Sequence, residues 1–178
     1  MVELTLIRDC IAIFGVIAGF SYYVLTVRAT QRNQKQALET RQAQLFMPLY
    51  GKLNDKEFMK DFGTMLTYQW DSYEDFMNKY GPYTNLDAWS VITACIDYYE
   101  GIGVLVKRNL IDISFIDDLM SGLIIMSWDK LRDYIYGMRE TRNYLQFGEY
   151  FEYLYNEIKA IAEEQHPEIK TGIIASED

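Results

Sequence analysis

The sequence predicts an all-α protein: a single N-terminal transmembrane helix, a polar stalk helix that continues it, and a helical bundle of four to five helices. Three observations predict this class. Residues 10–27 form an uncharged apolar run, later segments repeat apolar side chains at helical spacing, and no segment alternates convincingly as a strand would. Only 3 prolines occur among 178 residues, so few interruptions of helices are expected.

The first element is the run from Cys10 to Val27, CIAIFGVIAGFSYYVLTV. At about 1.5 Å per residue it reaches roughly 27 Å, close to the roughly 30 Å hydrocarbon thickness of a bilayer. The run is therefore interpreted as a transmembrane helix in contact with membrane lipid. Two alternatives stay open. Val27 and Ala29 are small residues at the spacing of a signal-peptide cleavage site, and the run could also be a buried core helix.

The charges on either side of this run predict its orientation. Ahead of it, in residues 1–9, Arg8 stands against Glu3 and Asp9, whereas residues 28–41 carry four basic groups and one acidic group. Basic flanks stay in the cytoplasm. We therefore expect a single-pass protein of the cell membrane, with an extracytoplasmic N-terminus and a cytoplasmic C-terminal domain.

Gly15 and Gly19 form a GxxxG pattern within the apolar run. Small residues four apart let two membrane helices approach closely, so a homodimer through this face is one expectation. The alternative is that glycine is simply common in membrane helices.

Residues 28–44 are rich in Gln, Arg and Ala and contain neither Pro nor Gly. These are good helix formers, so a polar juxtamembrane stalk helix is expected. Pro48 should end it, because proline interrupts the helical hydrogen bonds. A bundle domain is then predicted over 45–165, followed by a flexible tail at 166–178.

The bundle helices are predicted from capping residues and apolar periodicity. In chain order they are a helix capped by Asn54, a short helix after Ser72 that Gly81-Pro82 stops, a helix over 87–107, a helix capped by Ser114 that reaches about residue 139, and a helix over 145–164. The uncharged stretches 88–96 and 119–128 are too short to span a membrane. Both are expected to be heavily buried.

Charge and cysteine content exclude several classes of protein. Residues 45–178 hold 12 basic and 23 acidic side chains, a net charge of −11. Such a domain repels phosphate backbones, so no nucleic-acid partner is expected. The 2 cysteines, Cys10 and Cys95, provide neither a disulfide framework nor a cysteine metal site.

The residues give no catalytic signature. The single histidine, His166, lies in the tail, and no glycine-rich phosphate loop occurs. Metal sites of four-helix bundles use Glu-x-x-His pairs, which this chain lacks. We therefore predict no catalytic, cofactor-binding or metal-binding residue. Asp97 and Glu100 lie three apart on one helical face and are the candidate buried polar groups. They could serve a ligand, or one could face water while the other accepts hydrogen bonds.

Tyrosines are the candidate partner surface, because their rings bury area while the hydroxyl stays hydrogen-bonded. The alternative is that they belong to the core and its boundary. The residues chosen are Tyr98, Tyr99, Tyr134, Tyr136, Tyr150 and Tyr153.

Four segments follow one another over residues 41–160. They are RQAQLFMPLYGKLNDKEFM, DYYEGIGVLVKRNLID, IIMSWDKL and FGEYFEYLYNEI. In this order the chain resembles a family of small archaeal and bacterial proteins classed as a domain of unknown function. The likeness is clearest at Tyr99-Glu100-Gly101-Ile102-Gly103 and at Leu110-Ile111-Asp112. The resemblance implies one membrane helix followed by a helical domain, and it implies no activity.

The expected function is a membrane-tethered, non-enzymatic interaction or accessory module. It would hold an acidic helical domain at the cytoplasmic face for a protein partner or membrane complex. The alternative is a small-ligand sensor or an enzyme that uses an inter-helix cavity with Asp97 or Glu100.

Overall fold

The computed structural model describes residues 2–165, which form six α-helices and no strand. The predicted all-α class is thereby confirmed. The chain divides into two compact units, Met1–Ala43 and Gln44–Asp178, which are considered separately here. The predicted tail, including His166, lies outside the described residues.

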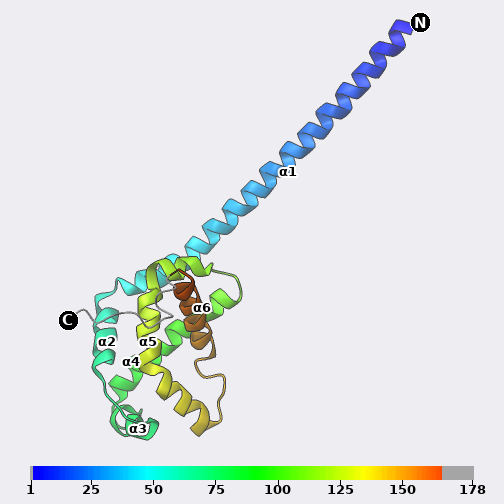
Figure 1. Cartoon of the computed structure of the whole chain (residues 1–178). Helices are drawn as coiled ribbons and strands as arrows, with labels where there is room; N and C mark the ends of the chain where they lie inside the picture. Colours follow the sequence, from blue (N-terminus) through cyan, green and yellow to red (C-terminus); the bar gives the residue numbers. More distant parts are fainter. Residues whose placement is uncertain (1, 166–178) are drawn as a thin grey trace, which may run out of the picture. The chain divides into compact units, whose positions relative to one another are not determined.

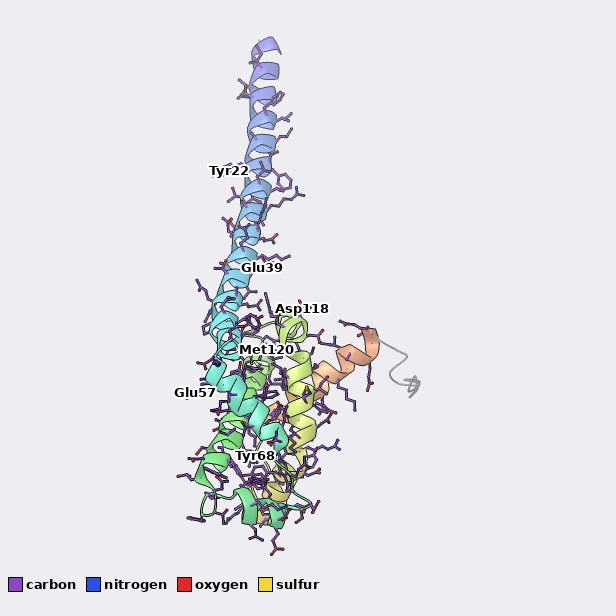
Figure 2. All side chains as sticks on the ribbon, turned by 90° about the vertical axis from the view of Figure 1, so that its left-hand side faces the viewer. Tyr22, Glu39, Glu57, Tyr68, Asp118 and Met120 are labelled. Atoms are coloured by element: carbon purple, nitrogen blue, oxygen red, sulfur yellow. The ribbon has the colours of Figure 1, made fainter. Side chains whose placement is uncertain are left out.

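The first unit is part of one helix, α1 (Val2–Leu53). The polar stretch after the apolar run is helical throughout, as predicted for a stalk. Side chains project from every side of this helix, as Tyr22 and Glu39 illustrate in Figure 2. Large apolar side chains are exposed, among them Phe14 at 73% and Phe20 at 67%. Considered by itself, this unit therefore has an exposed apolar surface.

The second unit begins with the last turns of α1, and here one prediction was wrong. Pro48 does not end the helix, which continues to Leu53. Phe46 and Leu53 are buried in the bundle core, and the Tyr98 hydroxyl donates a hydrogen bond to the Leu49 carbonyl at 2.6 Å. Proline costs a helix interior about 3 kcal/mol. Burial on both sides of the proline offsets that cost.

Two short helices follow, α2 (Lys56–Thr67) and α3 (Tyr73–Tyr80). Asp55 caps α2 by accepting hydrogen bonds from the N–H groups of Glu57 and Phe58. The predicted cap, Asn54, was thus one residue early. Ser72 caps α3 as predicted, and Gly81 ends it.

Three long helices complete the bundle: α4 (Leu86–Lys107), α5 (Ile113–Arg142) and α6 (Glu149–Gln165) (Figure 1). Asn85 caps α4. Asp112 caps α5, in place of the predicted Ser114, because its carboxylate accepts the Ser114 N–H. Asn143 adopts the left-handed conformation that ends α5.

The core lies between the long helices. Their most extensive contact is that of α4 with α6. The stretch 88–96 is largely buried on its core side, with Ile92 and Ile96 at 0% and 1% exposed. The prediction for 119–128 was wrong for one side of α5, where Leu119 and Met126 are about half exposed. The sequence shows an apolar surface all round this stretch, whereas the bundle covers only one side of it.

At Gly103 the backbones of α4 and α6 come close together. A Cβ atom built on Gly103 would lie 2.1 Å from the Tyr150 carbonyl oxygen, which belongs to the backbone of α6. Gly101 lies two residues earlier and is exposed, and a Cβ there would meet nothing within 4 Å. Of the two glycines, Gly103 is required by helix packing and Gly101 is not.

We predict that Gly103→Ala destabilises the full-length protein by about 1–3 kcal/mol, because the added methyl forces α4 and α6 apart. The matched control Gly101→Ala should be neutral or stabilising by up to about 1 kcal/mol, because alanine favours a helix interior. Urea unfolding in detergent, followed by helical circular dichroism, measures both. Equal effects of the two substitutions would contradict the packing described.

Candidate functional site

The amino end of α6 receives a carboxylate from another helix. Oε2 of Glu100, on α4, accepts a hydrogen bond from the backbone N–H of Phe151 at 2.8 Å. The first N–H groups of a helix have no acceptor within that helix, so they need one from outside. A negative charge is also favoured at this end of the helix dipole. Glu100 thus caps α6 from another helix, whereas an N-cap side chain normally comes from the residue just before the helix.

Burial raises the pKa of Glu100 above its ordinary value of 4.5, and the nearby Glu149 carboxylate adds to this rise. The backbone N–H groups of Phe151 and Tyr150 and the charge of Arg139 oppose the rise without cancelling it. The hydrogen bonds favour the charged form of this half-buried carboxylate. The desolvation cost of that form is larger, so the pKa stays raised.

Helix α5 also contacts the amino end of α6, through polar side chains. Nη1 of Arg139 lies 2.6 Å from Oε2 of Glu152, and its Nε donates to the Phe147 carbonyl at 2.8 Å. The Tyr136 hydroxyl donates to Oε1 of the same glutamate at 2.8 Å. The arginine side chain is only 14% exposed. This partly buried pair therefore links α5 both to the first turn of α6 and to the loop before it.

The aromatic ring of Tyr99 completes the junction. It is fully buried and stacks on Phe151 with ring centroids 4.9 Å apart. The segment Tyr99–Gly103 thus provides a stacked ring, a capping carboxylate and a glycine that admits the α6 backbone. All three contribute to the docking of α6 on α4.

The two candidate polar residues behave differently. Asp97 is exposed, and Glu100 is half-buried and hydrogen-bonded to α6. This is the arrangement in which one carboxylate faces water and the other accepts hydrogen bonds. Neither residue lines the small cavity between α2 and α4.

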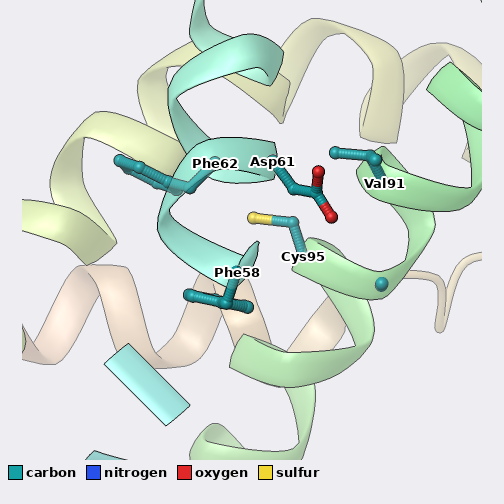
Figure 3. A pocket seen from close by; sticks show the side chains of 6 residues that line it. Phe58, Asp61, Phe62, Val91 and Cys95 are labelled. Atoms are coloured by element: carbon teal, nitrogen blue, oxygen red, sulfur yellow. The ribbon is translucent and has the colours of Figure 1, made fainter. Parts of the chain in front are cut away.

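That cavity has a volume of about 50 Å³ (Figure 3). Its lining residues are Phe58, Asp61, Phe62, Val91, Ala94 and Cys95. The sulfur of Cys95 points into it, toward the helix that carries Phe58 and Phe62. Burial raises the pKa of this thiol to about 12. Ligand pockets are typically of roughly 300 Å³ or more, so this space suits a water molecule rather than a substrate.

The predicted tyrosine surface was wrong for two residues. Tyr99 and Tyr134 are 0% and 1% exposed and belong to the core. Tyr98 is half-buried and hydrogen-bonded to the end of α1. Tyr150 and Tyr153 are also half-buried, and Tyr136 is exposed at 40%. The remaining tyrosines therefore do not form one open surface.

Two features of this region were not predicted. One is the link between Arg139 and Glu152, whose residues lie on different helices and carry no spacing signal. The other is Lys130, whose ammonium group lies 4.6 Å from the ring centre of Trp70 and donates to the Tyr68 carbonyl. Within residues 2–165, no group of three or more His, Cys, Asp or Glu side chains could hold a metal ion.

Residues 66–158 match the model of a family described as Domain of unknown function (DUF4760). The chain belongs to this family. The match covers α3, α4, α5 and most of α6, so the whole junction around Glu100 and Arg139 lies inside the DUF4760 region. The predicted resemblance to a domain-of-unknown-function family is confirmed. No curated protein and no solved structure matches the chain.

We predict that Glu100→Gln changes the pH dependence of stability. Because the folded-state pKa of Glu100 is raised, wild-type stability is greater below the ordinary value of 4.5 and falls as pH rises through the folded-state pKa. Glutamine keeps an acceptor for the Phe151 N–H but does not titrate. The difference in unfolding free energy, variant minus wild type, should therefore increase from pH 4 toward pH 7, measured by urea unfolding.

Glu100→Ala is the matched control, because it removes the acceptor as well as the charge. It should be about 1 kcal/mol less stable than Glu100→Gln at every pH in this range, because neither variant titrates at this position and only the alanine lacks the acceptor. A free-energy difference between Glu100→Gln and wild type that does not change with pH would contradict the role given to burial.

Proposed function

We propose that this protein is a membrane-tethered, non-enzymatic interaction or accessory module. Its N-terminal helix would anchor it in the cell membrane, and its acidic helical bundle would serve a protein partner or a membrane complex at the cytoplasmic face.

The observation that carries the proposal is the apolar part of α1. Among the described residues, one helix is long and apolar enough to cross a membrane, with a mean hydropathy of 2.0 over its best window. None of that window is buried among the residues that the structure describes. Exposed Ile, Phe and Val side chains over three or more turns are unfavourable in water, and a bilayer covers them without any partner.

The charges support the orientation. Arg28, Arg32 and Lys35 follow the apolar run and are exposed. They lie at spacings of four and three residues, so they share one face of the helix. Anionic headgroups of a cytoplasmic leaflet attract such a group, whereas they repel the net charge of −11 on residues 45–178.

The junction around Glu100 supports a non-enzymatic role. A general acid or base must reach the proton that it transfers. The Glu100 carboxylate accepts a hydrogen bond from the Phe151 N–H, and the Arg139 guanidinium group forms an ion pair with Glu152. Both groups hold α6 in place, so the geometry favours the interaction module over the sensor or enzyme with an inter-helix cavity.

We predict that the full-length protein stays with the membrane fraction after extraction with alkaline carbonate. We also predict that protease added outside intact cells leaves the bundle uncut, whereas protease added to inside-out vesicles digests it. A tag placed after residue 178 reports both results.

A protein released by carbonate would contradict the anchor. A bundle digested only from outside would contradict the orientation and leave the anchor in place.

Self-association through the membrane helix forms part of the proposal. Nothing lies within 4 Å of a Cβ built on Gly15 or Gly19, so both are open for a second copy. Replacing both with Leu should remove dimers that are crosslinked in membranes, because larger side chains keep two helices apart. The same change at the exposed Val16 and Phe20 is the control. Unchanged dimers in the glycine variant would reject this face.

A further inference from the structure

The outer side of the first half of α5 carries apolar side chains where a bundle helix normally meets water. Leu119 and Met126 are 48% and 51% exposed, whereas Phe115 is partly buried because it packs against the core, with its ring centroid 5.6 Å from that of Phe46. Gly122 lies between Leu119 and Met126, and a Cβ built there would meet nothing within 4 Å. These four residues of α5 follow at spacings of four, three and four, so they form one stripe along the helix. We call it the outer stripe.

Beyond Phe115, the outer stripe is separate from the core of the bundle. The residues of α5 that face the other helices are Met120, Ile124 and Trp128, which are 1%, 0% and 2% exposed. Figure 2 labels Asp118, which is exposed, and Met120, which is buried among the helices. The first half of α5 is thus apolar on two opposite sides. Among the described residues, the bundle covers one of them and only the beginning of the other, at Phe115.

The charges around the outer stripe are acidic. At helical spacing, Asp118 and Asp129 lie along one edge of it, and both are exposed. No basic side chain occurs between residues 109 and 129. The first one, Lys130, directs its ammonium group onto the ring of Trp70 at 4.6 Å.

Arg132 does not reverse this charge. It follows the stripe by more than one turn, and it lies 3.6 Å from Asp129 and 3.7 Å from Asp133. Two carboxylates therefore share one guanidinium group. The rim of the stripe remains negative.

We propose that the outer stripe docks a basic amphipathic helix of a partner protein. The spacing of the stripe is the one that a facing helix uses to insert its own apolar side chains. The acidic rim complements Lys or Arg side chains that flank the apolar face of the partner. This inference deepens the proposed interaction function and rests on it.

A second copy of this chain is a poorer occupant. It would bring its own acidic rim and its own net −11 over residues 45–178 to the contact. Like charges placed across an interface oppose association. A membrane surface with anionic headgroups is opposed for the same reason.

The test uses the full-length protein in nanodiscs of neutral phosphatidylcholine and two synthetic probes. Both probes are amphipathic helices with Leu at the a and d positions, and the flanking e and g positions are all Lys in one and all Glu in the other. Fluorescence anisotropy measures binding, and empty nanodiscs report binding to lipid. We expect the Lys probe to bind at least about tenfold more tightly than the Glu probe, because only the Lys probe complements the acidic rim.

The double variant Leu119→Ser with Met126→Ser should weaken binding of the Lys probe by about tenfold or more, because it removes most of the apolar contact. Leu145→Ser is the matched control, since Leu145 is 70% exposed in the loop before α6 and lies off the stripe. It should leave binding unchanged. Hydrogen exchange should slow over residues 115–126 when the Lys probe is bound.

Three results would overturn the inference: equal binding of both probes, equal effects of the stripe and control variants, or slowed exchange elsewhere in the bundle. Disulfide-linked dimers formed through Met126→Cys, in a protein that also carries Cys10→Ser, would assign the stripe to a second copy instead. The membrane fractionation above does not depend on the stripe. A failure of the docking site and a failure of the anchor therefore give different results.

Discussion

The amino end of α6 needs acceptors for its free N–H groups, and one of these acceptors comes from another helix. Glu100 reaches the Phe151 N–H from α4, while Arg139 and Tyr136 hold Glu152 from α5. This arrangement requires α4 and α6 to lie close together, which Gly103 permits. The charged side chains of Glu100 and Arg139 thus both contribute to the position of α6.

The sequence predicts the helices well, because helix formation depends on local signals. Apolar periodicity located all five helices after the first, and capping residues placed their ends within a few residues. Pro48 shows the limit of these signals, because a local helix breaker is tolerated where Phe46 and Leu53 are buried on either side of it. Local propensity is outweighed by tertiary packing there.

The residues of the junction could be predicted only in part. Asp97 and Glu100 were recognised as a pair, but sequence spacing does not tell which one points toward another helix. Arg139 and Glu152 lie on different helices, so no local pattern joins them. The tyrosines were chosen for their chemistry, and Tyr99 and Tyr134 proved to be core residues. The outer stripe could not be predicted for a related reason. Residues 119–128 are apolar on every side of the helix, so the sequence does not tell which side the bundle buries.

The central claim is that Glu100 on α4 caps α6 and so organises the bundle. Hydrogen exchange of the Phe151 amide, followed by NMR in the full-length protein, tests it most directly. N–H groups in the first turn of a helix exchange quickly when water is their only acceptor. The account predicts that this amide exchanges as slowly as the core of α4, and that Glu100→Ala accelerates its exchange more than that of the α4 core. Rapid exchange in the wild-type protein, as at a frayed helix end, would contradict it.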